Sequence, residues 1–345
     1  MSATIEHADK LKATAKAMLA TGKGLLAADE SSGTIAKRFD AVGIENTEEN
    51  RRLYRQMLLT TPGVEKYLSG VILYDETIRQ KDDAGRPFAK VLSDSGIIPG
   101  IKVDMGAKDL ALHPGEQVTE GLDGLRERFA EYAALGAGFA KWRAVYTIDG
   151  DSLPSVACHK ANAHGLARYA ALAQEAGIVP VVEPEVLLDG NHTIQRCYEV
   201  MVETLDTLFT ALKNQEVLLE GVILKASMVL SGKDAPNRAD IKTVAEQTVK
   251  CLTEHVPKEL GGVVFLSGGQ SDEGATAHLN AMHQLGDLPW PLTFSYSRAI
   301  QNPVLKLWSE DKKDEAVKAY LHRTEANSLA SQGKWTEAFE DKRPY

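Results

Sequence analysis

The regular alternation of short apolar runs with longer helical stretches constrains the fold of this chain more than any other feature. Eight runs have the length and the Val, Ile and Leu content of buried β-strands. They span Gly22–Asp29, Leu68–Asp75, Ile97–Asp104, Phe139–Tyr146, Ile178–Glu185, Leu219–Ala226, Gly262–Gly268 and Pro291–Arg298. The ends of successive runs are 29 to 46 residues apart, which leaves room for one helix and two loops in each unit.

Eight strand–helix units predict an α/β fold, and a (β/α)8 barrel is favoured over a doubly wound open sheet. The barrel is favoured because charged residues stand near the C-terminal ends of the runs, where barrel enzymes build their active sites. They are Asp29, Asp75, Lys102, Asp104, Lys141, Arg143, Glu183, Glu185, Lys225 and Arg298. Side chains two apart on a strand share a face, so the pairs within one run point the same way.

No linker, low-complexity block or shift in composition divides the chain, so we expect residues 1–345 to form a single barrel domain. A helix over about 1–21 is expected before the first strand, because Leu11 and Met18 lie on one apolar face. A polar tail of about 334–345 is expected after the last helix.

The overall charge and the cysteines restrict the class of partner and the compartment. The formal net charge is −9, which argues against nucleic acid and anionic membrane surfaces as general partners. No apolar run approaches the ~18 residues that a membrane-spanning helix needs. The three cysteines, Cys158, Cys197 and Cys251, lie far apart and form no CxxC pair, which favours a reducing, cytoplasmic location.

One lysine has an unusual setting. Lys225 lies late in the apolar segment GVILKASMV, where loss of hydration disfavours the charged ammonium, and a second cation such as Lys141 would act in the same direction. A free amine is the nucleophile that attacks carbonyl groups in Schiff-base chemistry. The alternative is a lysine whose stem packs while its head reaches solvent, and this segment alone favours that alternative.

Three carboxylates are candidates for the proton transfers that Schiff-base chemistry requires. Glu183 and Glu185 lie in VVEPEVL, and Asp29 lies in LLAADESSG. Neighbouring carboxylates and lysines shift one another's pKa, so different groups hold different protonation states. The alternatives are that Asp29 only caps a helix and that the Glu-Pro-Glu segment is a polar loop end.

Two anion sites are indicated. Ser267–Gly269 follows the seventh run and Arg298 opens the helix after the eighth, the two places where barrels often bind phosphate. A second cationic set consists of Lys102, Arg38 and the Ser31–Thr34 turn. Together they fit a substrate with a phosphate at each end. Metal and nucleotide sites are not expected, because HxH, HExxH, GxGxxG and P-loop patterns are missing.

Taken together, these segments resemble the class I (Schiff-base) fructose-bisphosphate aldolases. The matching segments follow one another from the first strand to the last. They are LLAADES at 25–31, IAKRF at 35–39, GIKVD at 100–104, EGLDGL at 120–125, FAKWR at 139–143, VVEPE at 181–185, LEGVILK at 219–225, FLSGGQS at 265–271 and LTFSYSRA at 292–299.

The resemblance implies a (β/α)8 enzyme of glycolysis and gluconeogenesis that reversibly cleaves fructose 1,6-bisphosphate to dihydroxyacetone phosphate and glyceraldehyde 3-phosphate. It implies a lysine Schiff base, no metal or other cofactor, a cytoplasmic location and a homotetramer. Lys225 would attack the C2 ketone, and Glu183 would serve the dehydration and deprotonate the C4 hydroxyl. The residues implied to support these proton transfers are Glu185, Lys141, Asp29 and, for exchange on the enamine, Tyr345.

The resemblance also assigns the substrate-binding residues. Lys102 and Arg143 would contact the substrate. One phosphate would bind Ser267, Gly268, Gly269, Ser295 and Arg298, and the other would lie near Arg38, Ser31 and Thr34. Three residues depart from the family pattern: Ala226-Ser227 replaces Pro-Asn after the lysine, and Ser297 replaces a glycine before Arg298. A side chain at 297 is expected to narrow the phosphate site or to shift the backbone.

Two other functions compete with this one. A transaldolase-like Schiff-base barrel would share the lysine but would not explain two phosphate sites on one substrate. A catalytically silent, phosphate-binding scaffold would not explain why so many charged groups are retained, since each costs stability when it is desolvated. Cleavage of fructose 1-phosphate or of a seven-carbon bisphosphate stays open at this point.

Overall fold

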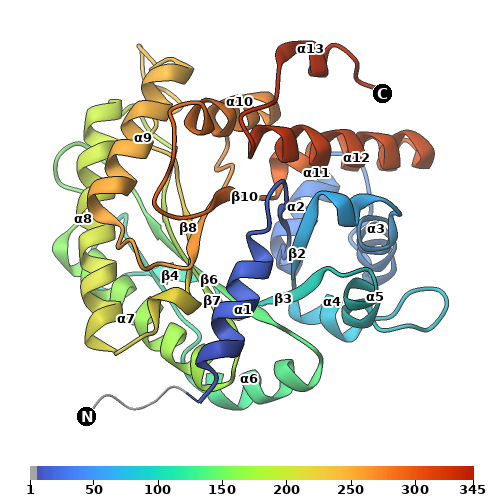
Figure 1. Ribbon diagram of the computed structural model, residues 1–345, viewed down its shortest axis with the longest axis horizontal. Helices are drawn as coiled ribbons and strands as arrows, with labels where there is room; N and C mark the ends of the chain where they lie inside the picture. The colour runs from blue at the N-terminus through green and yellow to red at the C-terminus, as the bar shows by residue number, and fades with distance from the viewer. Residues whose placement is uncertain (1–5) are drawn as a thin grey trace.

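The computed structural model describes residues 6–345, and a closed barrel of parallel strands forms its centre (Figure 1). The barrel strands are β1 (Gly24–Ala28), β2 (Leu68–Leu73), β3 (Ile98–Lys102), β6 (Phe139–Tyr146), β7 (Val179–Val186), β8 (Ile223–Ala226), β9 (Gly262–Phe265) and β10 (Leu292–Tyr296). Each strand pairs with the next barrel strand in the chain, and β10 closes on β1. The predicted (β/α)8 barrel is therefore confirmed.

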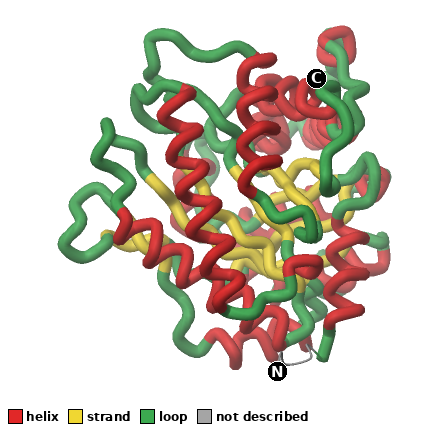
Figure 2. The backbone as a smooth tube through the Cα atoms, turned by 60° about the vertical axis from the view of Figure 1, so that its left-hand side comes forward, coloured by secondary structure: helices red, strands yellow, loops and turns green. Residues whose placement is uncertain are grey.

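Helices cover the outside of the barrel, as Figure 2 shows, and the N-terminal helix lies at one end of it. They are α1 (Ala8–Met18), α2 (Ser32–Asp40), α3 (Glu48–Thr60), α4 (Asp75–Arg79), α5 (Phe88–Asp94), α6 (Leu125–Ala134), α7 (Val156–Glu175), α8 (Ile194–Asn214), α9 (Ile241–His255), α10 (Asp272–His283), α11 (Arg298–Ser309), α12 (Lys313–Ala330) and α13 (Glu337–Glu340). A small antiparallel hairpin of β4 (Ala107–Asp109) and β5 (Gln117–Thr119) lies between the third and fourth barrel strands.

Several predicted strand ends are wrong by a few residues. Asp75 and Arg298 begin helices α4 and α11 instead of ending strands. An acidic side chain is favourable in the first turn of a helix, which explains the start of α4. The start of the sixth predicted run, Leu219–Gly221, is a 3-10 turn, and β8 begins only at Ile223. The hairpin of β4 and β5 was not predicted, because three-residue polar strands leave no apolar periodicity.

The N-terminal helix closes one end of the barrel. The expected helix over 1–21 is present as α1, whereas residues 1–5 lie outside the described part of the chain. Leu11 and Met18 of α1 are buried together with inward-facing strand residues such as Val179 and Ile223. The Ser69 hydroxyl at the start of β2 donates a hydrogen bond to the Met18 carbonyl at 2.5 Å. The N-terminal strand ends are thus sealed, and the C-terminal ends are left to build a site.

The barrel interior is packed with side chains. The Phe139 ring lies against Gly100 of β3 and Gly70 of β2, and a Cβ on Gly100 would stand 2.3 Å from a carbon of that ring. A glycine is therefore required at 100 for Phe139 to fill the interior. Burying such a ring contributes about 1.5–3 kcal/mol to stability.

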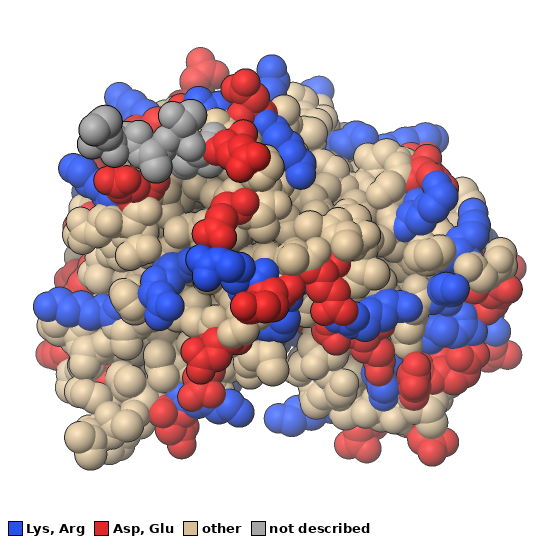
Figure 3. All heavy atoms as spheres, turned by 90° about the horizontal axis from the view of Figure 1, so that it is seen from below, with Lys and Arg blue, Asp and Glu red and all other residues tan. Residues whose placement is uncertain are grey.

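The surface carries both signs of charge. On the face in Figure 3, Lys and Arg side chains are interleaved with Asp and Glu side chains. Among residues 6–345, no helix combines the length and the apolarity required to span a bilayer.

Candidate active site

A cavity of about 480 Å³ opens among residues at the C-terminal ends of the strands. Its lining comes from seven of the eight barrel strands or the loops after them, together with α2 and the start of α11. Those residues are Ala27, Asp29, Glu30, Ser31, Thr34, Lys37, Arg38, Ala41, Lys102, Lys141, Arg143, Glu183, Glu185, Lys225, Leu266, Ser267, Gly268, Ser295, Ser297 and Arg298. Every site residue predicted from the sequence is among them, except Gly269 and Tyr345.

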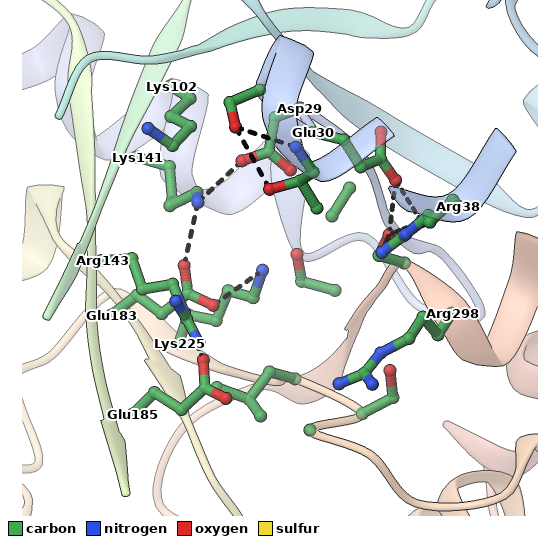
Figure 4. Close-up of a pocket in the computed structure, with 18 of the residues that line it drawn as sticks. Asp29, Glu30, Arg38, Lys102, Lys141, Arg143, Glu183, Glu185, Lys225 and Arg298 are labelled. Carbon is green, nitrogen blue, oxygen red and sulfur yellow. Dashed lines mark hydrogen bonds and ion pairs between the residues drawn. The ribbon is translucent and has the colours of Figure 1, made fainter. Parts of the chain in front are cut away.

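A row of alternating charges crosses the floor of the cavity (Figure 4). Lys225 Nζ lies 3.1 Å from Glu183 Oε1, and Lys141 Nζ lies 3.2 Å from Glu183 Oε2. Lys141 Nζ also contacts Asp29 Oδ2 at 2.7 Å. Glu183 therefore bridges the two lysines. The side chains of Lys225, Glu183 and Lys141 are each 4% exposed, so bulk water does not screen these contacts.

The row fixes the protonation state of three of its members. Burial opposes ionisation of Asp29, but the charges of Lys141 and Lys225 outweigh it and lower its pKa to about 2. The same balance holds the pKa of Glu183 below its usual range. Burial would lower the pKa of Lys141, but Asp29 and Glu183 outweigh that effect and raise it. Lys141 is thus a permanent cation beside Glu183.

These contacts decide between the alternatives left open by the sequence. Lys225 does not extend to solvent, because its head group ends on Glu183 inside the barrel. Asp29 does not cap α2, since the hydroxyl of Ser31 accepts the hydrogen bond from the backbone N–H of Thr34 instead. Glu183 lies within the buried strand β7 and not in a loop, as does Glu185.

Two further ion pairs lie beside this row. Arg143 Nε contacts Glu185 Oε2 at 2.5 Å, linking β6 to β7. Burial opposes the charge on Arg143, but Glu185 outweighs it and raises the pKa of the guanidinium. Lys102 Nζ contacts Asp104 Oδ1 at 2.5 Å, and Asp104 also accepts a hydrogen bond from the Arg143 backbone N–H. The same-face pairs on β6 and β7 therefore meet at one mouth with Lys102 of β3, as the two-residue spacing predicts, whereas Asp104 lies beyond the end of β3 and does not line the cavity.

One end of the cavity is built to receive an anion. Gly268 and Gly269 have positive φ values of 45° and 85°, a conformation that favours glycine, and Gly268 lines the cavity. Gly269 does not line the cavity, but a Cβ on it would stand 3.8 Å from Arg298 Nη2. The Ser295 hydroxyl is buried without a hydrogen-bond partner in residues 6–345.

The guanidinium at this end lacks a counter-charge in the drawn site. In Figure 4 no dashed line reaches Arg298. Burial, followed by the nearby charge of Arg38, lowers the pKa of Arg298, whereas Glu185 acts in the opposite direction. A bound anion would relieve this repulsion, which makes the loop after β9 and the start of α11 the strongest anion site in the cavity.

The other end contains a second set of cations and hydroxyls. The Ser31 and Thr34 hydroxyl oxygens are 3.1 Å apart, and Lys37 and Arg38 follow on α2. Sequence reasoning missed Lys37 and Glu30 as members of the site, and it noted Ser297 only as a departure beside Arg298. The position of Glu30 beside Asp29 was an available signal, since both follow the first strand. Lys37 has the pattern of an ordinary exposed helix residue, so the sequence contains no signal that it belongs to the site.

The terminal tyrosine lies apart from the cavity. Tyr345 is half-buried and packs edge-on against the ring of His322, with the ring centroids 5.8 Å apart. Burial raises the pKa of its phenol. In this conformation Tyr345 does not line the cavity that contains Lys225.

Comparison with known proteins explains this set of residues. The family model described as "Fructose-bisphosphate aldolase class-I" matches residues 10–344. The chain belongs to the class I fructose-bisphosphate aldolase family. A "Probable fructose-bisphosphate aldolase class 1" of Xanthomonas campestris pv. campestris is 62% identical over 330 residues, covering 95% of this chain and 98% of the relative.

More distant aldolases also match nearly the whole of this chain. The "Fructose-bisphosphate aldolase, cytoplasmic isozyme" of Spinacia oleracea is 49% identical, covering 96% of this chain and 93% of that one. A crystal structure of fructose-bisphosphate aldolase from Plasmodium falciparum, in complex with TRAP and a small molecule inhibitor, superposes with a TM-score of 0.94. It is 47% identical and the match covers 96% of each chain. The barrel is thus that of an aldolase.

Proposed function

We propose that this chain reversibly cleaves fructose 1,6-bisphosphate to dihydroxyacetone phosphate and glyceraldehyde 3-phosphate through a Schiff base on Lys225. The observation that carries the assignment to Lys225 is its contact with Glu183 at the floor of the cavity, 3.1 Å from Nζ to Oε1. A lysine nucleophile needs a neighbouring group to take and return protons, and a buried carboxylate within hydrogen-bond reach meets that need.

The reaction then proceeds with Glu183 as the proton carrier. Glu183 first takes a proton from the ammonium of Lys225, and the neutral amine attacks the C2 ketone to give a carbinolamine. Glu183 then returns this proton to the departing hydroxyl, so that water leaves and an iminium forms. Glu183 next removes the proton of the C4 hydroxyl. The C3–C4 bond breaks, its electron pair passes into the iminium to form an enamine, and glyceraldehyde 3-phosphate leaves. Protonation at C3 and hydrolysis release dihydroxyacetone phosphate and return Lys225.

Lys141, Asp29 and Glu185 support these steps in our proposal. Lys141 keeps its charge and holds Glu183 and Asp29 in place on either side of it. A fixed cation at this position also stabilises an oxyanion that develops on the sugar hydroxyls. Glu185 is held by Arg143, which orients both side chains toward the open part of the cavity.

The two ends of the cavity would bind the two phosphates. We assign one phosphate to Ser267, Gly268, Gly269, Ser295 and Arg298. There the Ser295 hydroxyl has no hydrogen-bond partner within residues 6–345, and no contact is drawn to Arg298 at the start of α11. We assign the other to Lys102, Arg38 and the hydroxyls of Ser31 and Thr34. Two such ends favour a bisphosphate over the single phosphate that a transaldolase-like enzyme handles, and a buried charge row is costly in a silent scaffold.

The proposed chemistry needs no metal ion. The iminium accepts the electron pair when the carbon–carbon bond breaks, which is the role that a metal plays in other aldolases. The described residues contain no cluster of three or more His, Cys, Asp or Glu side chains that would suit a metal ion. We therefore expect activity to persist in a chelator.

The cellular setting is inferred from the family. We propose a cytoplasmic enzyme that acts as a homotetramer of single-domain barrels, with sugar bisphosphate and triose phosphates as its small-molecule partners. Tyr345 would have to leave His322 before it could serve proton exchange on the enamine. Light scattering on the purified protein tests the tetramer, with a stable monomer or dimer as the contrary result.

A coupled assay tests the proposed function. Fructose 1,6-bisphosphate is supplied with and without EDTA, and both triose phosphates are measured. We expect equal amounts of the two products and the same rate in EDTA. Absence of cleavage would refute the function, and loss of activity in EDTA would refute the metal-independent mechanism.

A further inference from the structure

We propose that Ser297 is a positioning residue that holds Arg38 of α2 against the start of α11 and so joins the two phosphate-binding ends of the cavity. The inference rests on the proposed function, because it assigns to Arg38 a contact with one substrate phosphate. It concerns a position where the chain has serine and the family resemblance leads one to expect glycine.

The Ser297 hydroxyl lies at the centre of a small hydrogen-bond network. It accepts hydrogen bonds from both Nη1 and Nη2 of Arg38, each at 3.1 Å, and donates one to Glu30 Oε1 at 2.8 Å. Arg38 Nη1 also contacts Glu30 Oε1 at 2.5 Å. The Arg38 guanidinium is therefore held between two groups, the Glu30 carboxylate from the loop after β1 and the Ser297 hydroxyl. Ser297 lies 259 residues after Arg38 in the chain.

The other side of the network is rigid. Glu30, whose side chain is 4% exposed, also accepts a hydrogen bond from Gln301 Nε2 at 3.0 Å. Gln301 donates to the Ala27 carbonyl at 2.7 Å and accepts from the Tyr54 hydroxyl at 3.0 Å. Ser297 thus connects Arg38 to a buried frame formed by β1, α3 and α11.

The backbone gives no other reason for a serine here. Ser297 has a φ of −108° and a ψ of −81°, so its φ lies outside the left-handed region and no glycine is required at this position. What the side chain adds is the hydroxyl and its contacts with Arg38 and Glu30.

Fixing Arg38 has a direct consequence for phosphate binding. A long side chain loses rotamer freedom when it closes on a ligand, and a guanidinium already held in place avoids part of that cost. Arg38 and Arg298 lie near enough for their charges to oppose each other. Ser297 and Glu30 together keep Arg38 in this place in the free enzyme, so that its phosphate meets a guanidinium that is already positioned.

The proposal predicts a specific change in substrate preference. Loss of the hydroxyl should weaken the contact of Arg38 with its phosphate and leave the chemistry at Lys225 intact. KM for fructose 1,6-bisphosphate should rise about 3- to 10-fold in Ser297→Ala, with kcat within about twofold, because the guanidinium loses both hydrogen bonds to the hydroxyl but keeps Glu30 as a partner. KM for fructose 1-phosphate should change less, because it carries one phosphate.

A double-mutant cycle separates positioning from a general structural effect. Ser297→Ala and Ser297→Gly are measured in the wild-type chain and in Arg38→Ala. Ser309→Ala is the control, because Ser309 ends α11 and its hydroxyl donates only to the Lys306 carbonyl within the described part of the chain. Under the proposal both position-297 variants raise KM equally in the wild-type background and change nothing in Arg38→Ala. An equal rise in both backgrounds, an unchanged KM, or wild-type behaviour of the glycine variant alone would overturn it.

The failure of this inference is distinguishable from failure of the proposed function. Each variant is also incubated with dihydroxyacetone phosphate and reduced with borohydride. If Lys225 is labelled but the cycle shows no coupling between Ser297 and Arg38, the aldolase assignment is retained and the proposed role of Ser297 is refuted. If wild-type Lys225 is not labelled, the proposed function itself is refuted.

Discussion

The carboxylate of Glu183 lies between Lys225 and Lys141, with one oxygen 3.1 Å from the first ammonium and the other 3.2 Å from the second. This bridge explains how two buried lysines coexist at the floor of one barrel. It also separates their roles. Lys141 is held as a cation by Glu183 and Asp29 together, whereas Lys225 forms an ion pair only with Glu183 among residues 6–345.

Replacing the nucleophile should separate binding from catalysis. In Lys225→Met we expect no turnover above background, because no amine is left to form the iminium. The phosphate-binding residues are untouched, so the Kd for fructose 1,6-bisphosphate by calorimetry should change by less than about tenfold. Lys242→Met is the control, since Lys242 is 80% exposed on α9 and remote from the cavity lining. Residual turnover in Lys225→Met would show that Lys225 is not the nucleophile.

Removing the proton carrier should slow the reaction without abolishing binding. Glu183→Gln keeps the shape of the side chain but cannot take a proton from the C4 hydroxyl. We expect kcat to fall about 10²- to 10⁴-fold, the usual contribution of a positioned acid–base group. Glu220→Gln, at an exposed pair with Lys12, should stay near wild type. A kcat for Glu183→Gln within threefold of wild type would exclude this role.

Arg298 should dominate the affinity for phosphate. In Arg298→Ala we expect KM for fructose 1,6-bisphosphate to rise at least about tenfold, because a hydrogen bond to a charged group is worth about 1.5–3 kcal/mol. Raising the salt concentration should weaken binding to wild type more than to the variant, since screening acts on the lost charge. Arg126→Ala, on the outer surface, serves as the control. An unchanged KM would place the phosphate elsewhere.

Glu340 should make the protein sensitive to acid. Burial opposes its ionisation, but His322 and Arg323 outweigh burial and lower its pKa to about 2. Because the folded pKa lies below the unfolded value, the stabilisation is present above the unfolded pKa and is lost as the pH falls toward 2. Glu340→Gln should reduce the free energy of unfolding by about 2–3 kcal/mol at pH 7.

The pH dependence provides the check on this prediction. Urea unfolding is measured from pH 7 downward, and the difference between wild type and Glu340→Gln should shrink as the pH drops through 4. Glu337→Gln, on an exposed position of the same short helix, should show no such difference. A destabilisation that is independent of pH would mean that lost packing, and not charge, accounts for the effect.

Much of the fold and of the site follows from local patterns in the sequence. The barrel strands were recognisable because parallel strands buried on both faces are continuous apolar runs. The cavity residues were recognisable because charge gathers where those runs end. Lys141 and Arg143 share a face simply because they are two apart, and the structure places both at the cavity.

The contacts between distant segments were not predictable in the same way. The bridge from Glu183 to two lysines depends on the tilt of β6, β7 and β8 relative to one another, which the spacing of residues along one strand does not determine. The contact of Ser297 with Arg38 joins residues 259 apart in the chain. The packing of Tyr345 on His322 likewise depends on the path of the tail after α12.

The most direct test of the central claim is to trap the Schiff base. The protein is incubated with dihydroxyacetone phosphate and treated with borohydride, which reduces the iminium to a stable secondary amine, and the modified peptide is mapped by mass spectrometry. We predict a single adduct on Lys225, with none in Lys225→Met. An adduct on Lys141 or another lysine alone, or no adduct at all, would contradict the mechanism.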